Sequence, residues 1–304
     1  MKSLTVGAPA GFDLARTARS HGWGGLLPFE HGPGGTLVRV LDYGGAAGPL
    51  TATISAAPGG LRVRTSRDAS AEERRRVARD VRRLLQLDED LAGFYAALAR
   101  EPEFAWAART GAGRLLRSPT VFEDLVKSVC TTNCSWALTV RMIEGLVGGL
   151  GRVGTDGRRS FPTPEVMARA PAGFYREVVR AGYRAPYLRE LAERVASGEL
   201  DPESWLESER PTPELKREMK RVRGVGDYAA ENLLKLVGRY DVLALDSWVR
   251  ARFARAHNRG RPCPDARIAR HYARFGEWRG LALWCDLTRD WFPDDAAPMV
   301  TADC

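Results

Sequence analysis

The sequence contains little cysteine and histidine and has no long apolar run, and each shortage excludes a class of protein. The cysteines are odd in number and scattered, which is typical of a reduced, cytosolic protein rather than of a disulfide framework. They are Cys130, Cys134, Cys263, Cys285 and Cys304. No uncharged apolar run approaches the ~18–20 residues of a membrane helix, and the first residues lack the apolar segment of a secretory signal. We therefore expect a bacterial cytosolic protein with no membrane partner.

Lysine is also scarce, since it supplies only five of the 46 basic residues. Basic residues nevertheless outnumber the 38 acidic ones, which gives a net charge of +8. A basic surface favours a polyanionic partner such as nucleic acid. An arginine-rich proteome would produce the same excess as solvated arginines, so charge alone leaves both interpretations open.

The 304 residues, 44% of them hydrophobic and 28% charged, are typical of a globular chain with two or three lobes. Short alternating apolar stretches predict antiparallel strands over 37–41, 50–54 and 61–64, followed by a helix over 68–85. Helical periodicity then recurs over 89–99, 119–149, 164–182, 186–197, 213–222, 227–237, 247–257, 264–274 and 278–290. The pattern predicts an α+β protein. It has an N-terminal β-sheet-plus-helix domain over 1–112, a helical domain over 113–292 and a polar tail over 293–304.

The segment Gly224-Val225-Gly226 is expected to form a tight turn between two helices. Glycines allow the main chain of the turn to approach a ligand closely. Because the second helix begins at the turn, its unpaired N–H groups would suit one DNA phosphate. A simple helix–helix connection is the alternative. Nearby Lys216, Lys220 and Arg223 are candidates for phosphate contacts or for a solvated helix face.

Asp246 lies where an apolar run meets the start of the next helix. One interpretation is a helix N-cap, since aspartate there accepts N–H groups of the first turn. The other is a carboxylate held at the mouth of a cleft. The two roles are compatible.

The spacing of this turn and Asp246 resembles that of the helix-hairpin-helix (HhH-GPD) DNA glycosylase superfamily, and in particular its 3-methyladenine glycosylase II and 8-oxoguanine glycosylase branch. Further stretches agree with that resemblance over about residues 10–292. They are 118–134, similar to the helix and loop that carry the family's intercalating wedge, Phe161-Pro162, Gly182-Tyr183-Arg184-Ala185, and 278–286. The resemblance implies a small N-terminal antiparallel β lobe and a two-lobed helical core with the hairpin at 213–237.

The departures from the family pattern are specific. Tyr228 stands where bifunctional members carry the lysine that forms an imine, and Lys235 is two helical turns further on. The last cysteines lack the spacing of the iron–sulfur branch, so no cluster is expected. Gly280 stands where the 8-oxoguanine branch has its base-reading glutamine, and Ser20-His21-Gly22-Trp23 also differs from that branch.

The resemblance implies a monofunctional DNA glycosylase that acts on duplex DNA as a monomer. Asp246 would stabilise the positive charge that develops on the sugar. Tyr228, Asn232, Trp248 and Trp284 would form the base pocket, although core packing is an equal interpretation of Trp284. The DNA contacts would be Arg223, Gly224, Val225, Gly226, Arg184, Asn133 as the plug and Tyr183 as the wedge.

The substrate class stays open on the sequence. An aromatic pocket favours alkylated purines through cation–π attraction, whereas the Gly182-Tyr183-Arg184-Ala185 similarity favours 8-oxoguanine. A non-enzymatic DNA-binding protein is a third possibility. The four histidines show no mutual spacing of metal ligands, so no catalytic metal is expected. The family implies one structural Na⁺ or K⁺ at the hairpin.

Overall fold

The N-terminal part of the chain forms an antiparallel sheet, as the alternating apolar pattern predicted, and this sheet has five strands. The computed structural model describes residues 3–292, so the predicted polar tail over 293–304 lies outside the described residues. The strands are β1 (Ser3–Gly7), β2 (Phe29–His31), β3 (Leu37–Leu41), β4 (Leu50–Ala57) and β5 (Gly60–Thr65), in the order β1-β5-β4-β3-β2. The three predicted strands are confirmed. The two at the edges, β1 and β2, were not predicted.

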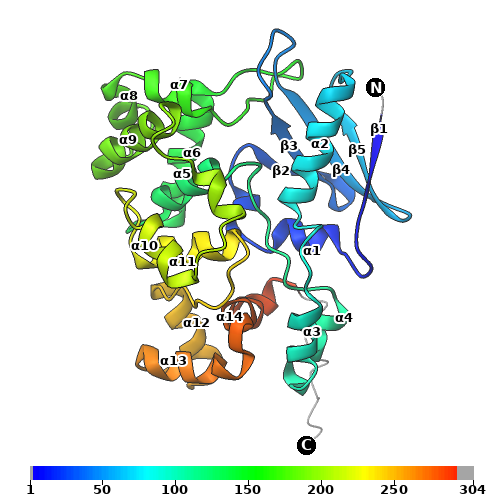
Figure 1. Cartoon of the computed structure of the whole chain (residues 1–304), viewed down its shortest axis with the longest axis vertical. Helices are drawn as coiled ribbons and strands as arrows, with labels where there is room; N and C mark the ends of the chain where they lie inside the picture. Colours follow the sequence, from blue (N-terminus) through cyan, green and yellow to red (C-terminus); the bar gives the residue numbers. More distant parts are fainter. Residues whose placement is uncertain (1–2, 293–304) are drawn as a thin grey trace, which may run out of the picture.

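Helix α2 (Ala71–Leu84) lies beside the sheet (Figure 1). It begins with a capping box in which the Ser70 hydroxyl accepts the Glu73 N–H at 3.1 Å and the Glu73 carboxylate accepts the Ser70 N–H at 2.8 Å. The inward residues Val77, Val81 and Leu84 are fully buried. The helix expected over 68–85 is therefore confirmed, with its start fixed at Ser70.

The rest of the described chain is helical. Its longer helices are α3 (Ala92–Leu98), α5 (Val121–Thr131), α6 (Trp136–Leu150), α7 (Pro164–Arg169), α8 (Ala172–Glu177), α9 (Ala185–Ala196), α10 (Thr212–Met219), α11 (Asp227–Leu236), α12 (Ser247–His257), α13 (Asp265–Tyr272) and α14 (Arg279–Thr288). The helical stretch expected over 119–149 is two helices, because Asn133 adopts a positive φ of 47° and Ser135 caps a new helix. The stretch over 164–182 also divides, since Pro171 begins a new helix at α8.

Two groups of contacts join the sheet to helix α5 and the segment of α3 and α4 (Ala105–Arg109) to the C-terminal helices. A fully buried Arg39–Glu123–Lys127 network joins strand β3 to helix α5. At the other end, α3 and α4 lie beside α14 and away from the sheet (Figure 1). There the Phe104 ring contacts the Phe275 ring with centroids 4.9 Å apart.

Candidate active site

The turn between α10 and α11 brings main-chain N–H groups to the surface. Gly224 has a φ of +91°, and a Cβ there would lie 2.9 Å from the Tyr187 ring, so the turn packs closely on that ring. Gly226 caps α11 without a side-chain acceptor. The N–H groups of the first turn of α11 are therefore left without a partner from the capping residue and are suited to an external anion.

The hairpin and the predicted wedge line one shallow hollow of about 450 Å³. Asn133 comes from the α5–α6 turn, and Tyr183 comes from the 3₁₀ turn before α9. Both side chains are exposed, Tyr183 by 50%. Six of the seven predicted DNA-contacting residues lie in this hollow: Arg223, Gly224, Val225, Gly226, Asn133 and Tyr183.

Arg184 is the seventh predicted DNA contact, and it is buried behind this surface. Its guanidinium donates to the Thr132 carbonyl and, at 3.3 Å, to the Thr132 hydroxyl. The same group lies 4.4 Å from the centroid of the Tyr183 ring. Arg184 thus supports the loop that carries Asn133 and the ring that lies beside it, and its direct contact with DNA stays a prediction.

The two lysines near the hairpin are engaged within the protein. The Lys216 ammonium contacts Glu231 at 2.5 Å and Asp227 at 3.0 Å, and the Lys220 ammonium contacts the same Asp227 oxygen at 3.0 Å. Arg223 makes a weaker contact of 3.5 Å with Glu190 and is 58% exposed. Among the three predicted phosphate contacts, Arg223 is the side chain best placed to turn towards an external anion.

Asp246 is the N-cap of α12, as the sequence predicted. Its Oδ1 accepts the Val249 N–H at 2.7 Å, which fixes the carboxylate at the start of the helix. The preceding loop is fixed by Glu231 on α11, because the Glu231 carboxylate accepts the Ala244 N–H at 2.7 Å. Ala244 has a φ of +54°, a strained conformation that this bond supports. The role of Glu231 was not identified from the sequence. Glu231 lies 15 positions before Asp246, and no local pattern links the two residues.

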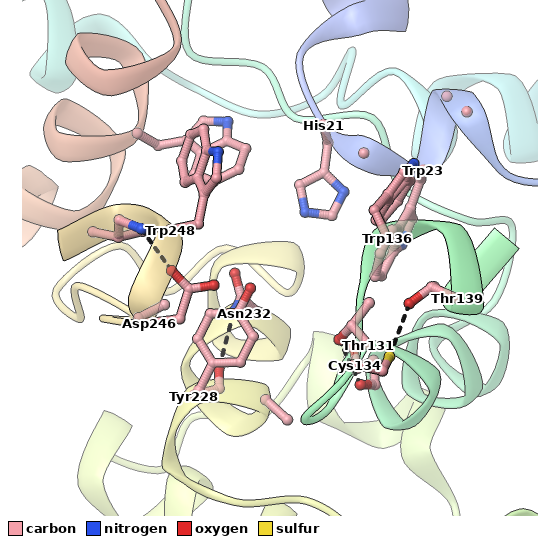
Figure 2. A pocket seen from close by; sticks show the side chains of 18 of the residues that line it. His21, Trp23, Thr131, Cys134, Trp136, Thr139, Tyr228, Asn232, Asp246 and Trp248 are labelled. Atoms are coloured by element: carbon pink, nitrogen blue, oxygen red, sulfur yellow. Dashed lines mark hydrogen bonds between the residues drawn. The ribbon is translucent and has the colours of Figure 1, made fainter. Parts of the chain in front are cut away.

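Beside Asp246 is a cavity of about 640 Å³ that all five predicted catalytic and pocket residues line: Asp246, Tyr228, Asn232, Trp248 and Trp284. Figure 2 shows the Asp246 carboxylate and the Tyr228 ring on the same side of this cavity. Burial, and then the negative charge of Asp246, raise the pKa of the Tyr228 phenol. The phenol is therefore neutral at physiological pH. The Asn232 side-chain amide donates to the Tyr228 main-chain carbonyl at 3.0 Å, so this NH₂ group is already engaged within α11.

The opposite wall consists of aromatic residues that sequence reasoning did not assign to the pocket. His21, Trp23 and Trp136 face Asp246 and Tyr228 across the cavity (Figure 2). Burial first, and then the charges of Lys235 and Lys127, lower the pKa of His21 to about 3, so the imidazole is neutral. The departure at Ser20-His21-Gly22-Trp23 was visible in the sequence, but its position at the cavity was not. Nothing in the sequence marked Trp136.

Lys235 lies behind the cavity wall. It is only 2% exposed, and its ammonium is 4.9 Å from the centroid of the Trp284 ring. Burial lowers the pKa of Lys235 to about 8. The Trp284 indole N–H donates to the Ser20 carbonyl at 2.7 Å, which fixes the ring between this lysine and the segment that carries His21. Trp284 thus both packs and lines the cavity.

Gly280 does not line the cavity. A Cβ at this position would lie 1.8 Å from the Val242 carbonyl oxygen, so the residue allows α14 to pack directly on the loop that leads to Asp246. A glutamine could not occupy this backbone position without displacing that loop. On α14 it is Trp284 whose side chain reaches the cavity.

Comparison with known proteins agrees with this architecture. No family model matches the chain. A probable N-glycosylase/DNA lyase of Methanothermobacter thermautotrophicus is 26% identical over 212 residues, which cover 62% of this chain and 65% of that protein. The match therefore spans slightly less than two thirds of the relative's length.

Two solved structures share the fold over almost the whole chain. The 3-methyladenine DNA-glycosylase of Archaeoglobus fulgidus has a TM-score of 0.74 at 20% identity and covers 96% of this chain and 99% of its own. The Clostridium acetobutylicum 8-oxoguanine glycosylase/lyase, in complex with double-stranded DNA containing cytosine opposite 8-oxoguanine, has a TM-score of 0.68 at 18% identity. It covers 92% of both chains.

The chain therefore has the fold of the helix-hairpin-helix DNA glycosylase superfamily, as the ordered sequence motifs predicted. Its N-terminal antiparallel sheet followed by a helical body is the architecture that it shares with the two solved structures above. Among the described residues, no helix is both long and apolar enough to cross a membrane.

Proposed function

We propose that the chain is a monofunctional DNA glycosylase, which flips a damaged base out of duplex DNA and hydrolyses its N-glycosidic bond. The observation that carries the proposal is a fixed carboxylate, Asp246, in the wall of an aromatic cavity next to a hairpin whose main-chain N–H groups suit a phosphate. DNA binding alone requires no carboxylate at such a position, which argues against a non-enzymatic binding protein.

The residues of the cavity suit this reaction. A base inside the duplex is inaccessible, so it must be extruded at a cost of a few kcal/mol. Breaking its bond to the sugar develops positive charge at C1′, which a nearby carboxylate stabilises. Asp246 also has the chemistry to orient or deprotonate the attacking water. Tyr228 has no amine and cannot form an imine, so the expected product is an abasic site in an intact strand.

Alkylated purines are the proposed substrates. Aromatic rings surround the cavity, and their electron-rich faces attract a cationic methylated base. Oxidised purines are the second candidate, and one contact favours them. The Lys235 ammonium lies against the Trp284 ring, where it would repel a cationic base on the other side of that ring.

The DNA partner and the hairpin cation belong to the same proposal. Duplex DNA would contact the hollow formed by the hairpin, Asn133 and Tyr183, and the enzyme would act as a monomer. Main-chain carbonyl oxygens of the hairpin are suitable hard ligands for one Na⁺ or K⁺. No step of the reaction depends on that ion.

The test is a panel of duplexes that each carry one lesion: 3-methyladenine, 1-methyladenine, hypoxanthine, 8-oxoguanine or uracil. Products are resolved on a denaturing gel after hot alkali, under single-turnover conditions. The proposal predicts alkali-dependent cleavage of an alkylated-purine duplex. Cleavage confined to the 8-oxoguanine duplex would support the second candidate.

The matched variants are Asp246→Asn and Asp265→Asn. Asp265 is an exposed acid on α13 that pairs with Arg250. We expect Asp246→Asn to bind DNA normally and to lose about a hundred- to a thousandfold in excision, a scale set by transition-state charge stabilisation, whereas Asp265→Asn stays active. Tight DNA binding by the wild type without release of any base would support the binding-protein interpretation instead.

A further inference from the structure

Three side chains of types that can ligate a metal come together from three helices, at the end of α12 away from Asp246. His257 is the last residue of α12, His271 lies in the last turn of α13, and Asp286 lies on α14. One ligand atom from each lies within 4.8 Å of the other two. Within residues 3–292 this is the one group of three such side chains close enough to share an ion.

We propose that His257, His271 and Asp286 bind one divalent transition-metal ion of the Zn²⁺ type. Two imidazoles and one carboxylate form a donor set that suits Zn²⁺, whereas Mg²⁺ and Ca²⁺ prefer oxygen ligands. Three protein ligands leave a fourth tetrahedral position for a solvent molecule or a small anion. The site is separate from the proposed glycosylase cavity, and its test does not depend on that function.

The surroundings of the cluster hold its side chains in place. The Tyr272 hydroxyl donates to Asp286 Oδ2 at 2.5 Å, an outer contact of the kind that orients metal-binding carboxylates. The buried Phe253 ring packs on both imidazoles, with centroids 5.1 Å from that of His257 and 5.3 Å from that of His271. In this structure His257 Nε2 lies 2.7 Å from Asp286 Oδ2, within hydrogen-bond distance. Tetrahedral Zn²⁺ ligands lie about 3.3 Å apart, so a small side-chain rotation admits the ion.

Nearby arginines define the competing interpretation. Arg267, Arg270 and Arg274 line the hollow beside the two histidines. Arg274 is paired with Glu101 at 3.2 Å and Glu103 at 2.9 Å, which offsets its charge. Arg267 and Arg270 are exposed, so solvent screens them, and they favour an anion in the fourth position. Without a metal, the same hollow could attract a phosphate group, and the experiment separates the two.

The proposed ion would be structural. Helix α12 has 11 residues, so His257 lies about 16 Å along the helix axis from the end that Asp246 caps. Asp286 is two residues beyond Trp284 on α14. An ion that joins α12, α13 and α14 would therefore fix the relative positions of the helices that carry Asp246 and Trp284. The 14-residue separation of the two histidines is the reason that sequence spacing did not reveal the cluster.

The experiment measures metal content directly. The purified full chain is stripped with chelator, dialysed against Zn²⁺, returned to metal-free buffer and analysed by elemental mass spectrometry. We expect one Zn²⁺ per chain. At a free Zn²⁺ concentration 100 times the Kd, we also expect the Tm to rise by about 5 °C. Co²⁺ loading should give the strong visible absorption of a tetrahedral site.

Three variants and one anion complete the test. Asp286→Asn and His271→Gln should lose the bound metal and the Tm rise, while His31→Gln, a histidine on β2, should keep both. His271→Gln keeps the test decisive if Asp286→Asn fails to fold. Failure of the wild type to retain Zn²⁺, or retention by folded His271→Gln, would overturn the proposal. So would a Tm rise with inorganic phosphate alone that Zn²⁺ does not produce.

Discussion

Asn133 and Tyr183, which are 50 positions apart in the sequence, are joined by a hydrogen bond in which the Asn133 amide donates to the Tyr183 hydroxyl at 3.2 Å. Both side chains are exposed, and Asn133 is held in a left-handed backbone conformation with φ 47°. Asparagine is among the few residues that tolerate this conformation. The pair therefore forms a small polar projection beside the hairpin, which the proposed function uses to fill the space left by a flipped base.

Asn133→Ala should weaken base flipping more than DNA binding. The variant removes the amide that would fill the stack, and a loss of 1–2 kcal/mol corresponds to roughly a tenfold fall in the flipped population. Flipping is measured with 2-aminopurine beside the lesion, and DNA affinity is measured in parallel by anisotropy. Asn258→Ala serves as the control, because Asn258 is an asparagine just after the C-terminal end of α12. Equal flipping by wild type and Asn133→Ala would remove Asn133 from the plug role.

On the proposed function, wild-type protein should release a base without nicking the strand, because Tyr228 has no amine with which to form an imine. Products are run with and without alkali, and a parallel reaction contains borohydride to trap any imine. Strand cleavage without alkali, together with a trapped protein–DNA adduct, would contradict this expectation. Lys235→Met and Lys127→Met would then show which buried lysine is responsible. Tyr228→Lys tests whether an amine at this position introduces cleavage.

The features that the sequence predicted most accurately are those that depend on a local pattern of residues. Strand β3 and helix α12 have the predicted bounds, and Asp246 caps α12, because alternation and capping are properties of neighbouring residues. Strand β2 was missed because three residues are too few to show an alternating pattern.

The sequence predicted only one wall of the cavity, the wall that α11, α12 and α14 form. The hairpin, Asp246 and the pocket residues of α11, α12 and α14 followed from motif positions. His21 and Trp136 did not, since their position at the cavity depends on how the N-terminal segment and α6 pack. Likewise, the pairing of Lys216 with Glu231 is a tertiary contact that no local pattern encodes.

Glu123→Gln should destabilise the fold strongly. Glu123 is 3% exposed and contacts Arg39 at 2.5 Å and Lys127 at 2.7 Å, whose side chains are 2% and 0% exposed. Loss of its charge removes the carboxylate that contacts both of these buried cations, at a cost of about 3–5 kcal/mol. Urea unfolding measures the change. Glu72→Gln, which breaks an exposed pair with Arg75, should cost less than ~1 kcal/mol. Similar losses in the two variants would contradict the buried-network assignment.

Lys235→Met should stabilise the protein at neutral pH, in a pH-dependent manner. Burial lowers the pKa of Lys235 from 10.5 to about 8 in the folded state, so the unfolded chain binds the proton more tightly. The charged lysine therefore destabilises the fold at pH 7, by about 3 kcal/mol at ~1.4 kcal/mol per pH unit. This cost decreases as the pH rises above 8 and vanishes only above 10.5, where the lysine is neutral in both states.

Urea unfolding of wild type and Lys235→Met at pH 7, 8.5 and 10 measures this dependence. We expect the variant to be more stable at pH 7 and its advantage to shrink towards pH 10, because the wild type gains stability over this interval. Lys220→Met is the matched control, since Lys220 is 40% exposed, whereas Lys235 is buried. A constant difference between wild type and Lys235→Met at the three pH values would show that Lys235 does not carry a lowered pKa. Its ammonium would then be fully charged behind Trp284 throughout the working pH range, which would strengthen the case for a neutral, oxidised base as the substrate.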